Sequence, residues 1–178
     1  MKKIVTFLSV FLLMISCSDN KHEFSYEQLS IKFEQCALVL TGGKVGSPDN
    51  WVDLSKYDGY HVPDYILQKN GVALECHRGG SVCLLPYHEE IEWSFDTIHG
   101  VIQFGTSPQN KWEIVEYDKN AITLVCKNGD IPCQYREYAL DYDRNAQLER
   151  YKMTYEEAKA ASDEYAKEWE ENHPQPVL

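Results

Sequence analysis

The sequence predicts a mainly β domain: an antiparallel meander that forms a barrel or a sandwich, followed by one C-terminal α-helix. Three observations predict this fold class. Short stretches in which apolar and polar residues alternate recur about every ten residues, with turn residues between them. Aromatic residues, which favour strands, make up 12% of the chain and include 12 tyrosines. Beyond residue 153 the alternation stops, and apolar residues follow a helical spacing instead.

The chain begins with a segment typical of secretory signals. Lys2 and Lys3 precede an almost wholly apolar run, residues 4–15. A helix of about twelve residues spans roughly 18 Å, which is less than the ~30 Å hydrocarbon core of a bilayer. We therefore expect residues 1–16 to be a cleaved signal peptide rather than a permanent membrane span.

The end of this segment, Leu13-Met-Ile-Ser-Cys17, resembles the lipobox of bacterial lipoproteins, with methionine where leucine is more usual. The resemblance implies that Cys17 becomes the new N-terminus and carries acyl chains such as palmitate. These chains hold a protein at a membrane because each buried methylene contributes ~0.8 kcal/mol. The alternative is an ordinary signal peptide with an incidental cysteine. Residues 17–25 are then a tether between the lipid and the folded domain.

The residues after Cys17 carry a second resemblance. Ser18, rather than aspartate, follows the cysteine, and by likeness to lipoprotein sorting signals this implies the outer membrane of the cell envelope. The stretch 18–21 also partly resembles the surface-export signal of lipoproteins in Bacteroides-type bacteria. Both a periplasmic and a surface-facing location stay open.

Charge restricts the partners of this single-domain-sized chain of 178 residues. The formal net charge is −11, and removing residues 1–16 also removes two lysines, which gives −11 − 2 = −13. Nucleic-acid binding depends on cationic contacts with phosphates, so we expect no nucleic-acid partner. Anionic headgroups repel such a protein, so the acyl chains have to make the membrane contact.

Residues 26–152 form the predicted antiparallel β domain. Its first strand lies within residues 26–41, where Leu29, Ile31 and Phe33 alternate with polar residues. The clearest strand is 91–96, with apolar residues at every second position. The other predicted strands, each bounded by turn residues, are 51–54, 65–67, 72–76, 82–85, 101–104, 112–117, 122–126 and 134–142.

A C-terminal helix is predicted within residues 153–173. Thr154 and Glu157 have the spacing of a capping box, and Pro174 ends the helical stretch. Four apolar residues recur at helical spacing: Ala158, Ala161, Tyr165 and Trp169. We expect this stripe to pack on the β domain; the alternative is that it binds a partner.

Four cysteines form two segments with the same spacing, Cys76/Cys83 and Cys126/Cys133. A two-residue turn at 79–80 or at 129–130 would place the cysteines of each pair opposite each other, within bonding range. The alternative turn at Asn128-Gly129 would shift Cys126 and Cys133 out of register. In an oxidising compartment we therefore expect two hairpin disulfides.

Other arrangements of these thiols stay open. Four cysteines allow three connectivities. A metal site built from Cys76, Cys83 and His77 or His88 is disfavoured because the spacing lacks the close pairing of structural zinc sites. Cys36 lies in an apolar run and is expected to be a buried free thiol.

The central segment carries a family resemblance. It comprises Trp93–Phe95, Gly100–Phe104, Lys111–Val115, Tyr117–Asp118 and Ile122–Leu124. This succession of an aromatic strand, a glycine turn, a Trp-x-Ile strand and an acidic turn resembles the meander of lipocalin-like lipoproteins. The resemblance implies an up-and-down barrel whose interior is filled by side chains or holds one small ligand. It implies no catalytic residues.

No nucleotide-binding, metalloprotease or hydrolase signature occurs in the sequence, and no cofactor is implied. Glu89, Glu90 and Glu92 could supply a catalytic carboxylate pair, but adjacent strand residues point to opposite faces. Glu90 and Glu92 share the face opposite Ile91 and Trp93, which we expect to be solvated. Asp49, Asn50 and Asp53 offer oxygen ligands of the kind calcium prefers, but they lack the spacing of a calcium loop, so no metal ligands are predicted.

Four aromatic residues are the better candidates for contact with a ligand or a partner: Trp51, Tyr57, Tyr60 and Tyr65. Such rings stack on sugars and anchor interfaces, although they can equally cover the end of a barrel. We expect a non-enzymatic, lipid-anchored binding module for a small apolar ligand or a glycan. The alternative is an acidic interaction protein, either an inhibitor or an accessory subunit in the cell envelope; an enzyme is the third choice.

Overall fold

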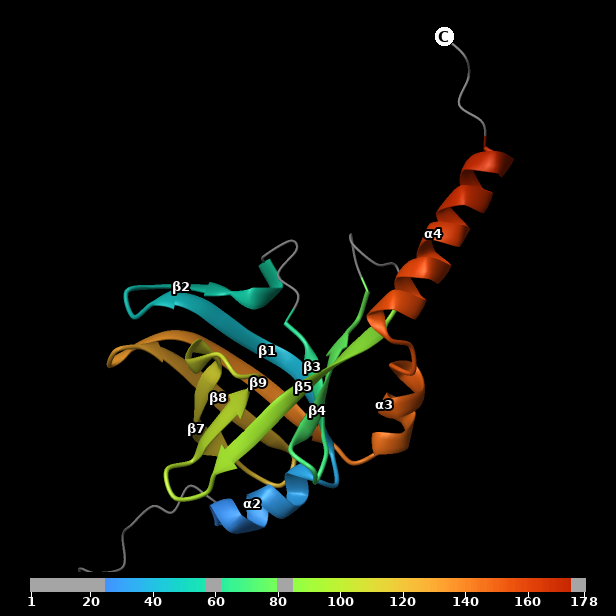
Figure 1. Ribbon diagram of the computed structural model, residues 1–178. Coiled ribbons are helices and arrows are strands. Elements are labelled where there is room, and N and C mark those ends of the chain that lie inside the picture. Colours follow the sequence, from blue (N-terminus) through green and yellow to red (C-terminus); the bar gives the residue numbers. More distant parts are fainter. Residues whose placement is uncertain (1–24, 57–61, 80–84, 174–178) are drawn as a thin grey trace, which may run out of the picture.

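The computed structural model describes residues 25–56, 62–79 and 85–173. Three α-helices and nine strands occur in these residues (Figure 1). The helices are α2 (Tyr26–Phe33), α3 (Arg144–Arg150) and α4 (Tyr155–Asn172). The strands are β1 (Ala37–Ser47), β2 (Asn50–Asp53), β3 (Asp64–Leu67), β4 (Val72–His77), β5 (Tyr87–Asp96), β6 (Val101–Phe104), β7 (Lys111–Tyr117), β8 (Ala121–Asn128) and β9 (Ile131–Asp141). Two 3₁₀ turns are η1 (Leu54–Lys56) and η2 (Pro108–Asn110).

The strands close into an antiparallel barrel. Each of β3 to β8 pairs with the next strand along the chain, and β1 joins the two ends because it pairs with both β3 and β9. Eight strands therefore form a closed wall, and β2 is an extension paired only with the far end of β1. Of the two predicted alternatives, the barrel is confirmed.

Helix α2 replaces the first half of the strand predicted within residues 26–41, so that prediction is wrong. Ser25 and Gln28 form a capping box: each side chain bonds the other's backbone N–H. Leu29 and Phe33, one helical turn apart, are both completely buried, whereas Ile31 is 58% exposed. Leu29 and Phe33 are four residues apart, a spacing that places them on one face of a strand and also on one face of a helix. In the structure they form the apolar face of α2, which covers one end of the barrel (Figure 1).

Tyr26 fixes this helix to the barrel rim. Its ring centroid lies 5.5 Å from that of Tyr117 and 6.0 Å from that of Phe95. Gly100, in the β5–β6 turn, has a φ of +66°, and a Cβ atom there would lie 2.3 Å from the Tyr26 ring. Glycine is therefore required at position 100 for two reasons: the turn needs a positive φ, and the Tyr26 ring of α2 leaves no room for a Cβ atom.

The barrel interior beneath α2 is filled with apolar side chains. Tyr65 stacks on Phe104 with a centroid distance of 3.9 Å and an interplanar angle of 6°. The completely buried members of this core are Leu29, Phe33, Cys36, Leu38, Leu67, Ala73, Ile102, Leu124 and Tyr138. A second, smaller core lies outside the wall, where Tyr151 packs with Ala37, Ile66, Leu74 and Cys76.

A polar network joins these layers at Asp64, which is 1% exposed. Between its pairings with β3 and β2, one edge of β1 pairs with no strand of the described residues. Side chains form hydrogen bonds with the Leu40 backbone there instead. The Leu40 N–H donates to Asp64 Oδ1 (2.8 Å), and Arg78 Nη2 donates to the Leu40 carbonyl (3.0 Å). Arg78 also binds both carboxylate oxygens of Asp64, and the Tyr151 hydroxyl donates to Oδ2 (2.6 Å). One carboxylate thus holds three distant segments together.

The C-terminal region differs from the prediction in two ways. Helix α3 was not predicted, because seven residues give too little periodicity. Helix α4 starts as predicted, with Thr154 and Glu157 bonded reciprocally. Its stripe packs only at the start: Ala158 is completely buried, whereas Tyr165 and Trp169 are 60% and 49% exposed. The expectation that the whole stripe packs on the β domain is therefore wrong, because the helix projects beyond the barrel (Figure 1).

The predicted hairpin disulfides are not formed among the described residues. Cys76, Cys126 and Cys133 are free thiols; Cys83 lies outside the described residues. The second turn does centre on residues 129–130, but an irregularity between Cys126 and Lys127 shifts the register, so Cys126 opposes Gln134. The Cys133 thiol instead donates to the Cys126 carbonyl (3.3 Å). Cys36 is a buried free thiol, as predicted.

Candidate binding site at the barrel mouth

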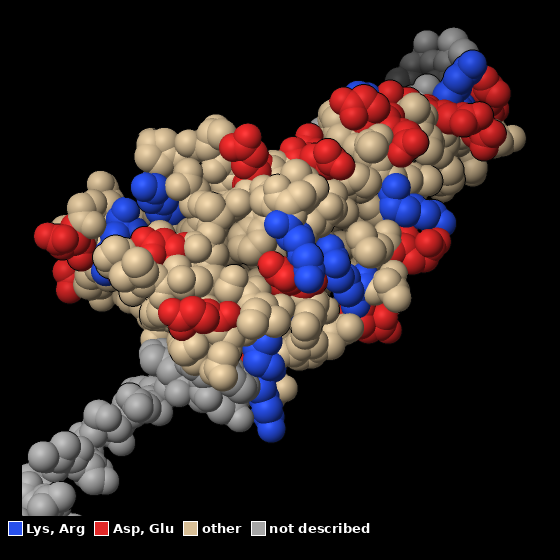
Figure 2. Space-filling view, turned by 60° about the horizontal axis from the view of Figure 1, so that its bottom comes forward, with Lys and Arg blue, Asp and Glu red and all other residues tan. Residues whose placement is uncertain are grey.

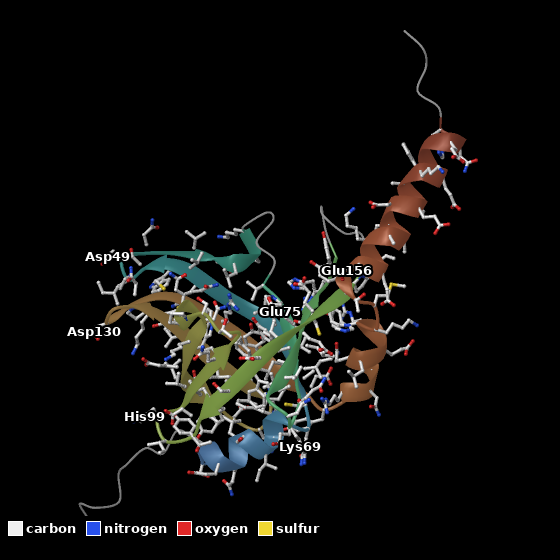
Figure 3. All side chains as sticks on the ribbon, in the orientation of Figure 1. Asp49, Lys69, Glu75, His99, Asp130 and Glu156 are labelled. Atoms are coloured by element: carbon white, nitrogen blue, oxygen red, sulfur yellow. The ribbon has the colours of Figure 1, made fainter. Side chains whose placement is uncertain are left out.

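The two ends of the barrel differ. At one end α2 covers the interior, beside the β3–β4 and β5–β6 turns that hold Lys69 and His99 (Figure 3). The opposite end, which we call the mouth, carries the β1–β2 and β8–β9 hairpin tips with Asp49 and Asp130 (Figure 3). No helix among residues 25–56, 62–79 and 85–173 covers the mouth in the way that α2 covers the other end.

Polar side chains face the barrel interior toward the mouth. Glu75 pairs with the inward-facing Tyr65 on one side and with Glu89 on the other, so all three share the inner face. His77, two residues after Glu75, lies on the same face. Figure 3 places Glu75 over the middle of the barrel, between its two ends.

These three groups lie close together. His77 Nε2 is 3.8 Å from Glu75 Oε1 and 3.7 Å from Glu89 Oε2. The imidazole stacks on the Tyr87 ring, with a centroid distance of 4.7 Å and an interplanar angle of 18°. The Glu75 and Glu89 side chains are 27% and 53% exposed, so solvent reaches them.

The environment of Glu75 changes its titration. Burial raises the pKa of this carboxyl above its ordinary value, and the negative charge of Glu89 raises it further, against an opposing effect of Arg136. A carboxyl with a raised pKa is more readily protonated, and in that form it can both donate and accept hydrogen bonds.

Strand β9 contributes a positive charge to the same interior. Arg136 pairs with the buried Leu124, so it faces inward, and its guanidinium carbon lies 4.1 Å from the centroid of the Trp112 ring. Burial raises the pKa of Tyr138 to about 12, although the charge of Arg136 and a hydrogen bond with it act in the opposite direction. The guanidinium is thus held among aromatic rings.

Gln134 is the second polar residue that β9 directs inward. It opposes Cys126, which packs against the interior core, and only 8% of it is exposed. Its side-chain Nε2 has no hydrogen-bond partner within the described part of the chain. A buried donor of this kind is costly unless water or a ligand accepts from it.

We define the mouth cluster as Glu75, His77, Glu89, Gln134 and Arg136. It combines two carboxyls, an imidazole, an amide and a guanidinium with an aromatic wall from the half-buried Tyr87. Such a set can form hydrogen bonds to a hydroxyl-rich molecule while a ring face stacks on it. Among the described residues, no group of three or more His, Cys, Asp or Glu side chains has an arrangement that could hold a metal ion.

The predicted aromatic contact residues do not form one surface. Tyr65 is 3% exposed and belongs to the interior core, so the prediction that it is an exposed contact is wrong. Trp51 lies on the outer wall, 5.2 Å from the Tyr135 ring, with the Lys44 ammonium 5.0 Å from its centroid. There it lines a surface cavity of about 790 Å³ between β1 and η1. Tyr57, Tyr60 and the predicted lipidation site Cys17 lie outside the described residues.

Sequence reasoning missed the mouth cluster, although one signal was present. The alternation that turns Ile91 and Trp93 inward also turns Glu89 inward. Glu75 and Arg136 carry no such signal by themselves, because only closure of the barrel brings β4 and β9 to opposite sides of one interior.

Searches against protein-family models, curated proteins and solved structures found no match to this chain. No helix among the described residues combines the length and the apolar character needed to cross a membrane.

Proposed function

We propose that this protein is a non-enzymatic, lipid-anchored lipoprotein of the cell envelope whose barrel mouth binds a small hydroxyl-rich ligand, such as a short glycan. The observation that carries the proposal is the inward-facing mouth cluster, above all the buried Gln134 Nε2, which has no hydrogen-bond partner among the described residues. Paired carboxyls and an amide suit hydroxyl groups, and the half-buried ring of Tyr87 suits the face of a sugar.

The filled interior favours a glycan over a long apolar ligand. Beneath the mouth, Tyr65, Phe104 and Tyr138 occupy the barrel and are at most 3% exposed. An acyl chain would have to displace these rings, and close-packed interiors resist such displacement. A ligand that stays near the rim meets the charged groups instead.

The proposed anchor gives the barrel an orientation. Ser25, at the start of α2, follows Cys17 by 25 − 17 = 8 residues, a stretch that extends at most about 28 Å. A lipid on Cys17 would keep the α2 end close to the membrane and direct the mouth away from it. We therefore expect the ligand to come from the aqueous compartment rather than from the bilayer.

Binding can be tested by calorimetric titration of the full chain, purified in detergent, with neutral disaccharides and trisaccharides and, separately, with oleate. We expect saccharide binding that Glu89→Gln weakens by about tenfold or more, the effect of losing one hydrogen bond to a charged group. Glu90→Gln is the matched control, because the neighbouring carboxyl on the same strand is exposed and faces outward. Binding of oleate alone, or equal effects of the two variants, would refute the proposed ligand class.

The anchor has a separate test. Cells that express the wild-type chain and a Cys17→Ser variant are grown with a radioactive fatty acid. Label that appears only in the wild-type chain would support the lipid anchor, and equal labelling would contradict it.

A further inference from the structure

The second half of α4 has an exposed face with aromatic residues. Every residue from Asp163 to Lys167 is exposed, and the apolar side chains of Tyr165 and Trp169 are 60% and 49% exposed. Together with Ala161 they follow one another at intervals of four residues, so they lie along one side of the helix. At the base of this side a cavity of about 320 Å³ is lined by Leu85, Ala161, Ser162 and Tyr165. We call Ala161, Tyr165 and Trp169 the α4 stripe.

This half of the helix makes contacts along its own length. Lys159 forms an ion pair with Asp163 (2.7 Å), and the Trp169 ring stacks on His173 (centroid distance 4.7 Å). Exposed pairs of this kind contribute little stability. Helical segments of about ten residues are marginal in water without packing of an apolar face. A partner that covers the stripe would supply that packing.

Charge distinguishes between the partners that could cover the stripe. Helix α4 contains seven acidic residues (Glu156, Glu157, Asp163, Glu164, Glu168, Glu170 and Glu171) and two basic ones (Lys159 and Lys167), a formal charge of 2 − 7 = −5. Figure 2 shows acidic side chains over much of the projecting helix. Glu164 and Glu168 each precede a stripe aromatic by one residue, so they flank the stripe at about 100° around the helix.

Two occupants are disfavoured by this charge. A second α4 packed along the first would bring two helices of charge −5 together. An anionic membrane surface would repel the helix in the same way, and α4 also extends away from the α2 end of the barrel (Figure 1). An apolar groove with positive charges along its rim, on another protein, would complement both the aromatic stripe and the carboxylates that flank it.

We propose that the α4 stripe docks into an apolar groove, rimmed by lysine and arginine, on another protein. The stripe supplies the anchors at helical spacing that such grooves bind, and the flanking carboxylates supply charge complementarity. The inference is independent of the mouth cluster and of its ligand.

Site-specific photo-crosslinking in the cells that naturally make the protein tests this proposal. A photoreactive phenylalanine analogue replaces Trp169 or Tyr165 in the full-length chain, and the matched controls carry it at Lys167 or Asp163. We expect one discrete protein adduct from the stripe positions and none from the controls, with the crosslinked peptide beside lysine and arginine residues. An adduct of two copies of this chain, an adduct to lipid, equal adducts from both faces, or no adduct overturns the proposal.

Affinity for the crosslinked protein, once purified, provides the second measurement. We expect Trp169→Ala to weaken binding by at least about tenfold, and an increase of salt from about 50 to about 500 mM to weaken it similarly. Alanine keeps the helix because it has the highest helix propensity, so the circular dichroism of the variant should match that of the wild type. Binding that is insensitive to salt, or unchanged by Trp169→Ala, would contradict the proposal; Glu89→Gln should have no effect on it.

Discussion

The buried carboxylate of Asp64 offers the sharpest test of how this barrel is held together. In Asp64→Ala, the Leu40 N–H and the Tyr151 hydroxyl lose their acceptor. A buried donor left unsatisfied costs about 1–3 kcal/mol. Arg78 is 45% exposed, so water replaces part of what it loses, and we assign it about 1 kcal/mol. With about 1.5 kcal/mol for each of the two donors, the sum is about 4 kcal/mol of unfolding free energy, within the range for breaking a buried charged pair.

Urea unfolding of the purified full chain, followed by tryptophan fluorescence, measures this loss. Tyr151→Phe removes one of the bonds and should cost about 1.5 kcal/mol. Tyr142→Phe is the matched control, because that hydroxyl bonds the Lys119 carbonyl at the surface and should contribute less than about 0.5 kcal/mol. A loss below about 1 kcal/mol for Asp64→Ala, or equal losses for the two tyrosine variants, would refute the reasoning.

Three further predictions concern the mouth, the α2 end and the thiols. The folded protein binds the proton of Glu75 more tightly than the unfolded chain, because the pKa of this group is raised, so its contribution to stability falls as pH rises through that pKa. Glu75→Gln should therefore melt at a higher temperature than the wild type at about pH 7, and equally below about pH 4. Gly100→Ala should lower the free energy of unfolding in urea by about 2–4 kcal/mol, and Gly129→Ala should lower it by about 1 kcal/mol. Both glycines have a positive φ, but a Cβ atom would clash with Tyr26 at Gly100 and would meet nothing within 4 Å at Gly129. Burial raises the pKa of Cys36 and Cys76 to about 12, so at about pH 8 both should resist iodoacetamide until the protein unfolds.

For each of these three predictions, one result would contradict the reasoning. A wild-type melting temperature above that of Glu75→Gln at about pH 7 would show that attraction to Arg136 outweighs burial. Equal costs of the two glycine variants would contradict the close approach of Tyr26. Rapid alkylation of Cys76 in the native state would contradict its burial.

Much of the wall could be predicted from the sequence, because strands with one buried face repeat their apolar residues at every second position. Residues 91–96 illustrate this, since Ile91, Trp93 and Phe95 all pack against the interior core. Helix α2 shows where the pattern is ambiguous: Leu29 and Phe33 fit both periods. The Ser25 and Gln28 pair, which has capping-box spacing, could have decided for the helix.

The site and the projecting helix could not be predicted in the same way. Whether Glu75 faces Arg136 depends on barrel closure, a contact between strands far apart in the chain. Tyr165 continues the spacing of the buried Ala158, but the barrel ends before α4 does. The register shift beside Cys126 has no pattern in the sequence that would have separated it from a regular hairpin.

The pairing of β1 with β9 also constrains how the molecule is made. Ala37 meets Asp141, so the seam joins residues separated by 141 − 37 = 104 positions. Long-range contacts form slowly because the ends of a long loop must first find each other. During synthesis β1 cannot form its pairing with β9 until β9 has emerged, and Asp64 cannot bind the Tyr151 hydroxyl until later still. The nascent chain therefore cannot acquire its final stability before residue 151 has been made.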